Sequence, residues 1–203
     1  MNKISLLFLS LICMAQSVNS DSISVSVQPV KSSSQIVLKS DRLKSKIFMI
    51  QFPLTYRVCN LSSEKAALYY YRYYFNSADK SHTTKLGWIG QGMLILKNID
   101  GKLQSPYNSG RIVIDPHQCN EYVTYTYHHI GKQGNYQEAF LPYLEKMKEK
   151  NKDTLNIGTF EEIRQIYPNL FEDFLKGDSV EFHFWKIYKE GMDKHIILPV
   201  EFL

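Results

Sequence analysis

The chain has 203 residues, 44% of them hydrophobic and 22% charged, which are values typical of a globular protein, and it contains no repeat, linker or low-complexity tract. Its formal net charge of +4 is mild and evenly spread, so nothing indicates a nucleic acid partner. The nearest basic run, Lys39 to Lys46, is interrupted by Asp41 and is typical of a solvated loop. Fourteen Tyr and eleven Phe residues suit half-buried pleated surfaces and favour β-strands.

The first twenty residues have the three parts of a secretory signal peptide. Lys3 supplies a positive charge, an uncharged apolar stretch runs from Ile4 to Ala15, and short residues lead to Ser20. The sequence therefore predicts a cleaved leader over residues 1–20 and export to the periplasm or the exterior. The apolar stretch is shorter than the roughly 20 residues needed to span a bilayer, and no later segment reaches that length. Ile12 stands where a small residue would have to precede an acylated Cys13, which argues against a lipid anchor.

Two cysteines, Cys59 and Cys119, remain after the leader. Two thiols in an oxidising compartment often pair, so we predict a disulfide between them. The alternative is two separate buried thiols, since a free cysteine packs like a small hydrophobic residue. With no third cysteine, a zinc cluster built on thiolates is excluded.

Period-two alternation predicts a succession of short strands in the first two thirds of the chain. Pro53 divides one long candidate, because proline cannot donate a hydrogen bond to a β-ladder. The strand with the strongest pattern, AALYYYRYYF, runs from Ala66 to Phe75. The expected strands cover residues 23–27, 36–38, 47–60, 66–75, 88–96, 111–114 and 121–130.

The pattern becomes helical between about residues 136 and 176. Pro142 predicts a helix start close to Leu141, and Thr159 predicts an N-cap before an acidic first turn. Pro168 ends that second helix, and a short third helix follows over residues 169–175. Two strands, 179–188 and 195–203, complete the chain.

Strands that follow one another without intervening helices pair antiparallel, which favours two stacked sheets. We therefore predict one mainly β domain over residues 21–203, an antiparallel β-sandwich with a helical insertion at about 136–176. In architecture alone it resembles the immunoglobulin-like sandwiches of exported proteins. The arrangement of Trp and Cys in antibody domains is missing, because Trp88 does not follow Cys59 at the expected distance. An open β-barrel with a helical cap is an alternative.

Motifs for catalysis or cofactor binding are absent from the sequence. It contains neither a G-x-S-x-G elbow nor a G-x-x-x-x-G-K-[ST] loop. His128 and His129 are adjacent on an expected strand, so their side chains point to opposite faces. The other four histidines lie on separate expected elements without metal-ligand spacing. The sequence therefore assigns no catalytic residue, metal ligand or cofactor. Asn60, Leu61 and Ser62 form an N-glycosylation sequon.

The tyrosine-rich strand is the candidate for binding. If Tyr69, Tyr71, Tyr73 and Phe75 face the core, then Tyr70, Arg72 and Tyr74 form an outward strip, which His183 and Trp185 could extend. Tyr, Trp and Arg are enriched at protein interfaces, and aromatic rings also stack on sugars. Alternatively, the helices cover the strip and make it a second core layer.

The sequence thus predicts an exported, non-enzymatic binding or accessory module for an unknown protein or glycan. A hydrolase with a loop-built site beside the helical insertion is the first alternative. A structural subunit of an envelope assembly is the second.

Overall fold

A computed structural model describes residues 23–75, 83–84, 87–88, 91–106, 111–131, 135–186 and 193–201. The predicted leader and Cys13 lie outside these residues. In the described part the protein is mainly β, with three antiparallel sheets of four or five strands, one two-stranded ribbon and four helices. No helix in these ranges has the length and hydropathy needed to cross a bilayer.

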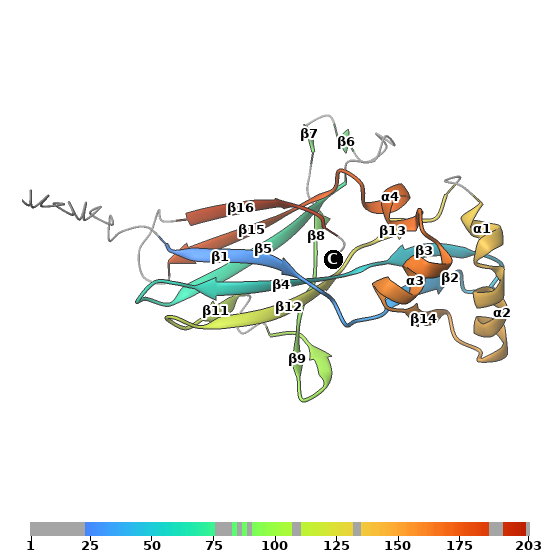
Figure 1. The fold of residues 1–203 in the computed structure, drawn as a ribbon, viewed down its shortest axis with the longest axis horizontal. Coiled ribbons are helices and arrows are strands. Elements are labelled where there is room, and N and C mark those ends of the chain that lie inside the picture. Colours follow the sequence, from blue (N-terminus) through green and yellow to red (C-terminus); the bar gives the residue numbers. More distant parts are fainter. Residues whose placement is uncertain are drawn as a thin grey trace, which may run out of the picture.

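Two five-stranded sheets lie against each other at one end of the molecule (Figure 1). The first has the order β1 (Val25–Val30), β4 (Pro53–Asn60), β12 (Cys119–Tyr125), β9 (Ile95–Ile99) and β10 (Lys102–Gln104). The second has the order β11 (Ile112–Ile114), β5 (Ala66–Tyr74), β15 (Ser179–Lys186) and β16 (Asp193–Pro199), with β8 (Gln91–Gly92) also paired to β5. Tyr56 of the first sheet contacts Tyr71 and Phe182 of the second, at ring-centroid distances of 6.1 and 5.0 Å. The inner faces therefore share one core.

The third sheet and the helices occupy the other end (Figure 1). The sheet has the order β13 (His128–His129), β3 (Ile47–Gln51), β2 (Ile36–Ser40) and β14 (Thr154–Gly158). The helices are α1 (Tyr136–Ala139), α2 (Leu141–Glu149), α3 (Phe160–Ile166) and α4 (Leu170–Leu175). The ribbon consists of β6 (Thr83–Thr84) and β7 (Gly87–Trp88).

Three stretches of chain connect the first sheet to the third: β1 leads into β2, β3 into β4, and β12 into β13. Phe52 separates β3 from β4, and the chain divides at Pro53 as the sequence predicts, because Pro53 is the first residue of β4. At the crossing point the Phe52 backbone N–H donates to the Thr126 hydroxyl, and the Thr126 N–H donates to the Phe52 carbonyl, both at 3.0 Å. The Phe52 ring is fully buried and contacts the rings of Phe160, Phe171 and Phe174 from the helices. The Phe52 ring therefore packs the start of β4 against α3 and α4.

The helix boundaries follow the predicted signals. Pro142 lies in the first turn of α2, where its missing N–H has no intrahelical partner to lose. Thr159 caps α3 in a reciprocal capping box with Glu162, whose carboxylate accepts from the Thr159 N–H at 2.7 Å. Ile163 of α3 is fully buried, but Ile166, one turn further on, is 58% exposed.

The region 136–176 also contains β14, a strand that the sequence does not predict. Its five residues, TLNIG, are too few to show a clear period. The strand forms because β2 offers a free edge to which it pairs antiparallel.

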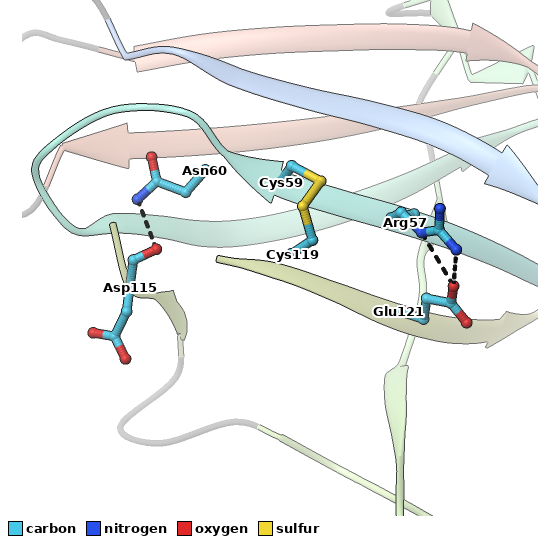
Figure 2. The surroundings of a disulfide bond; sticks show 6 residues. All are labelled: Arg57, Cys59, Asn60, Asp115, Cys119 and Glu121. Atoms are coloured by element: carbon cyan, nitrogen blue, oxygen red, sulfur yellow. Dashed lines mark hydrogen bonds and ion pairs between the residues drawn. A yellow bond between two sulfur atoms is a disulfide. The ribbon is translucent and has the colours of Figure 1, made fainter. Parts of the chain in front are cut away.

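The predicted disulfide is present. Cys59 and Cys119 are directly opposite each other on β4 and β12, with their Cα atoms 4.0 Å apart (Figure 2). The prediction of a mainly β fold is also confirmed. The immunoglobulin-like arrangement stays a prediction.

The sequon residue Asn60 is buried and its amide is part of a turn. The amide nitrogen donates to the carbonyls of Glu64, Ile114 and Asp115 at 2.8, 3.0 and 3.2 Å; Figure 2 draws the last of these. A glycan would have to be attached to this same nitrogen. The folded protein therefore does not present Asn60 as an acceptor.

A buried polar cluster lies where the second sheet meets the helices. The Tyr73 hydroxyl donates to the Asp178 carboxylate, and His128 Nε2 lies 3.9 Å from that carboxylate. The rings of Phe52, Phe75 and Phe174 surround the imidazole, and burial lowers the pKa of His128 from 6.5 to about 3.

This shift predicts a loss of stability in mild acid. The unfolded chain protonates His128 below pH 6.5, whereas the folded protein does not until about pH 3. The free energy of unfolding should therefore fall by about 1.4 kcal/mol per pH unit as the pH drops below 6.5, or about 2 kcal/mol at pH 5. Urea unfolding at pH 7, 6 and 5 measures this change in the free energy of unfolding. His128→Phe should flatten the profile and exposed His129→Ala should not; equal slopes for wild type and His128→Phe would contradict the assignment.

Candidate ligand-binding face

A β-bulge decides which tyrosines of β5 point outward. Opposite β15, Leu68 pairs with Phe184 and Tyr70 with His183, which leaves Tyr69 as an extra residue. The alternation therefore changes phase: Leu68, Tyr71 and Tyr73 are buried, while Tyr69 is 48% exposed. The predicted inward orientation of Tyr69 is wrong for this reason.

The bulge brings a set of aromatic and charged side chains onto the outer face of the β5–β15–β16 sheet. We call this set the outer face; its members are Tyr69, Tyr70, Arg72, Tyr74, Glu181, His183, Trp185, Asp193 and His195. The rings of Tyr69 and Trp185 stack on each other, with centroids 4.8 Å apart and planes 2° from parallel. Trp185 is 47% exposed, so this pair presents an apolar surface to solvent.

A second stack crosses the same face. The Arg72 guanidinium lies 4.2 Å from the Tyr70 ring centroid, in a cation–π contact. The Tyr70 ring contacts that of His183 at 4.5 Å, and His183 stacks on His195 at 4.1 Å. Side chains from three strands thus hold one another in fixed positions.

Two carboxylates connect these rings by hydrogen bonds. Glu181, only 6% exposed, accepts from the Tyr74 hydroxyl and lies 2.6 Å from His195 Nδ1. Asp193 Oδ2 lies 3.1 Å from His183 Nε2 and 3.4 Å from His195 Nε2. His195 is therefore placed between the two carboxylates.

The pKa values shift as these contacts require. The hydrogen bond to Glu181 raises the pKa of His195, despite an opposing effect of burial, and Asp193 adds to the rise. Burial tends to raise the pKa of Glu181, but hydrogen bonds from Tyr74 and His195 bring it below its ordinary value. Hydrogen bonds from His183 and His195 lower the pKa of Asp193. The arrangement favours a protonated His195 between two anionic side chains.

His183 has conflicting partners. Its Nε2 lies 2.9 Å from the Trp185 indole N–H and 3.1 Å from Asp193 Oδ2. One nitrogen cannot accept from the first and donate to the second at the same time. Its Nδ1 is buried and has no hydrogen-bond partner among the described residues. The imidazole is thus incompletely satisfied whichever tautomer it adopts.

The predicted binding residues Tyr70, Arg72, Tyr74 and Trp185 all lie on this face. The described helices do not cover it: α2 and α3 pack on β14, and α4 on Phe52. Whether the face binds anything stays a prediction. Four members of the face are not predicted from the sequence: Tyr69, Glu181, Asp193 and His195. The pattern that could have identified three of them is period-two alternation, with E-x-H-x-W on one strand and D-x-H on the next.

The sequence offers a hydrolase with a site beside the helices as an alternative. A His–carboxylate pair, His128 and Asp178, lies at that place. Both are buried, with 7% and 3% exposure, and Tyr73 shields them further. Among the described residues, contacts between histidines and carboxylates near the surface occur on the outer face and not beside the helices.

Comparison with known proteins assigns no relative: no family model matches the chain, and neither a curated protein nor a solved structure matches it significantly.

Proposed function

We propose that this chain is an exported, non-enzymatic binding module whose outer face docks a protein partner. The observation that carries the proposal is the exposed Tyr69–Trp185 pair on a sheet face that no described helix covers. Export is supported by the leader-like N-terminus and by the Cys59–Cys119 disulfide. An immunoglobulin-like arrangement of the first two sheets suits the same role.

The composition of the face favours a protein over a sugar. Residues that dominate protein interfaces are Trp, Tyr and Arg, and the outer face contains each of them. Tyr69 and Trp185 stack face to face, so one face of each ring is covered by the other ring and is not available to a sugar. The surrounding Arg72, Glu181 and Asp193 supply both signs of charge, which suits a polar rim.

The proposal predicts that removing the aromatic pair strongly weakens partner binding without unfolding the protein. Two exposed hot-spot residues each contribute at least about 1–2 kcal/mol, so Tyr69→Ala with Trp185→Ala should weaken binding by a factor of about 100. The measurement is quantitative crosslinking of the purified mature protein to the envelope or secreted fraction of its source cells, followed by affinity determination with the isolated partner. The melting temperature should change little.

The matched control is Leu141→Ala with Ile166→Ala, which removes two exposed apolar side chains from the helical end. It should bind like the wild type. Equal partner binding by the aromatic variant, or wild-type binding to a glycan array in place of any protein, would overturn the proposal.

A further inference from the structure

Three potential metal ligands meet on the outer face. His183 and His195 pair directly across β15 and β16, and Asp193 precedes His195 by two residues on the same side of β16. Each side chain contributes one donor atom, and the three atoms lie within 4.8 Å of one another. Neighbouring strands of a regular hairpin hold all three, so the cluster does not depend on a loop.

The separations are close to those of a tetrahedral site. Metal–nitrogen and metal–oxygen bonds of about 2.0–2.1 Å place tetrahedral ligands about 3.3 Å apart. Asp193 Oδ2 lies 3.1 Å from His183 Nε2 and 3.4 Å from His195 Nε2. Two of the three edges therefore already have the required length.

Glu181 orients His195 as a metal ligand. A histidine that binds a metal usually donates its other ring N–H to a carboxylate, which fixes the tautomer and the ring orientation. Glu181 Oε1 lies 2.6 Å from His195 Nδ1, and the Tyr74 hydroxyl holds the second Glu181 oxygen. When an ion replaces the proton on His195 Nε2, the Nδ1–H bond to Glu181 still fixes the ring, and the Nε2 lone pair becomes available to the ion. This contact is an independent sign of a ligand position.

We propose that His183 Nε2, Asp193 and His195 Nε2 bind a divalent first-row transition ion of the Zn²⁺ class. Imidazole donors select such ions over Mg²⁺ or Ca²⁺, which prefer an all-oxygen environment. Three protein ligands on a solvent-exposed face leave the fourth position for water or for a group of a bound molecule. The inference goes beyond the proposed function and does not require a partner.

Binding requires two local adjustments. The stacked His183 and His195 rings are 21° from parallel, so the His195 ring, 43% exposed, must tilt to direct its lone pair at the ion. The Trp185 N–H must leave His183 Nε2, and half-exposed Trp185 can then donate to water. The ion also displaces a proton from His195, so affinity should fall as the pH is lowered.

Isothermal titration of the tag-free, metal-stripped mature protein with ZnCl₂ tests the proposal. We expect one ion per chain, tetrahedral visible absorption when CoCl₂ is used, and quenching of Trp185 fluorescence by NiCl₂ that Trp185→Phe removes. His183→Ala and His195→Ala should each abolish the stoichiometric site. Glu181→Gln should weaken it by about 10- to 100-fold while keeping the cobalt spectrum, as expected of a positioning residue.

The control is His129→Ala, which removes an exposed histidine elsewhere and should titrate like the wild type. Melting temperatures recorded without metal identify any variant that fails to fold; in that case Asp193→Asn, at an exposed position, replaces it. Absence of stoichiometric binding by the wild type, or unchanged binding by folded His195→Ala, would overturn the metal site. Neither result bears on partner docking through Tyr69 and Trp185.

Discussion

Replacing Phe52 with alanine is expected to lower the free energy of unfolding by about 3–5 kcal/mol, the usual range for a buried Phe→Ala change. The ring is fully buried and contacts three phenylalanines from α3 and α4 as well as His128. Its loss leaves a cavity where the helical end meets the stacked sheets, and the double hydrogen bond with Thr126 limits collapse into it. Urea denaturation at pH 7 gives the value.

Tyr69→Ala is the matched control, since it removes an aromatic ring that is half exposed. It should lower stability by less than about 1 kcal/mol, because an exposed side chain loses little burial. A Phe52→Ala effect no larger than this would show that the helical end is not held through Phe52.

Removing the disulfide is expected to destabilise the protein by about 4 kcal/mol. Cys59 and Cys119 are 60 residues apart in sequence, and closing a loop of that length restricts the unfolded chain by this amount in the chain-entropy model. The check is chemical denaturation of the Cys59→Ala, Cys119→Ala double variant beside the wild type, each with and without dithiothreitol.

Reductant should bring the wild type close to the double variant and leave the double variant unchanged. If reductant has no effect and the double variant lies within about 1 kcal/mol of the wild type, the hydrogen bonds of β4 and β12 alone hold that pair of strands. The bridge would then be dispensable for stability.

Local signals account for the parts of the fold that the sequence predicts correctly. Pro53 marks the β3–β4 boundary because a missing N–H is a property of one residue. Thr159 and Glu162 form a capping box through contacts three residues apart. The opposite exposure of His128 and His129 follows from strand geometry alone. None of these three predictions requires knowing which strand or helix lies next to the residue.

The features that the sequence does not predict depend on which strands pair and in which register. The bulge at Tyr69 exists only in the register of β5 against β15, and it reverses the orientation of every side chain on one side of it. Likewise, the convergence of His183 with Asp193 and His195 requires the register between β15 and β16. Alternation along single strands predicted Tyr70, Arg72, Tyr74, His183 and Trp185 for the face. It could not show that the donor atoms of His183, Asp193 and His195 lie within 4.8 Å of one another.

The stretches of chain that run between the first and third sheets also restrict how this protein can be shortened. A fragment that ends before residue 136 would keep β3 and β13 but lose β14, the helices, and β15 with β16. A fragment restricted to the helical end would lose the strands that continue past Phe52 and Thr126. Expression work that seeks a smaller crystallisable unit should therefore shorten surface loops instead of dividing the chain between its ends.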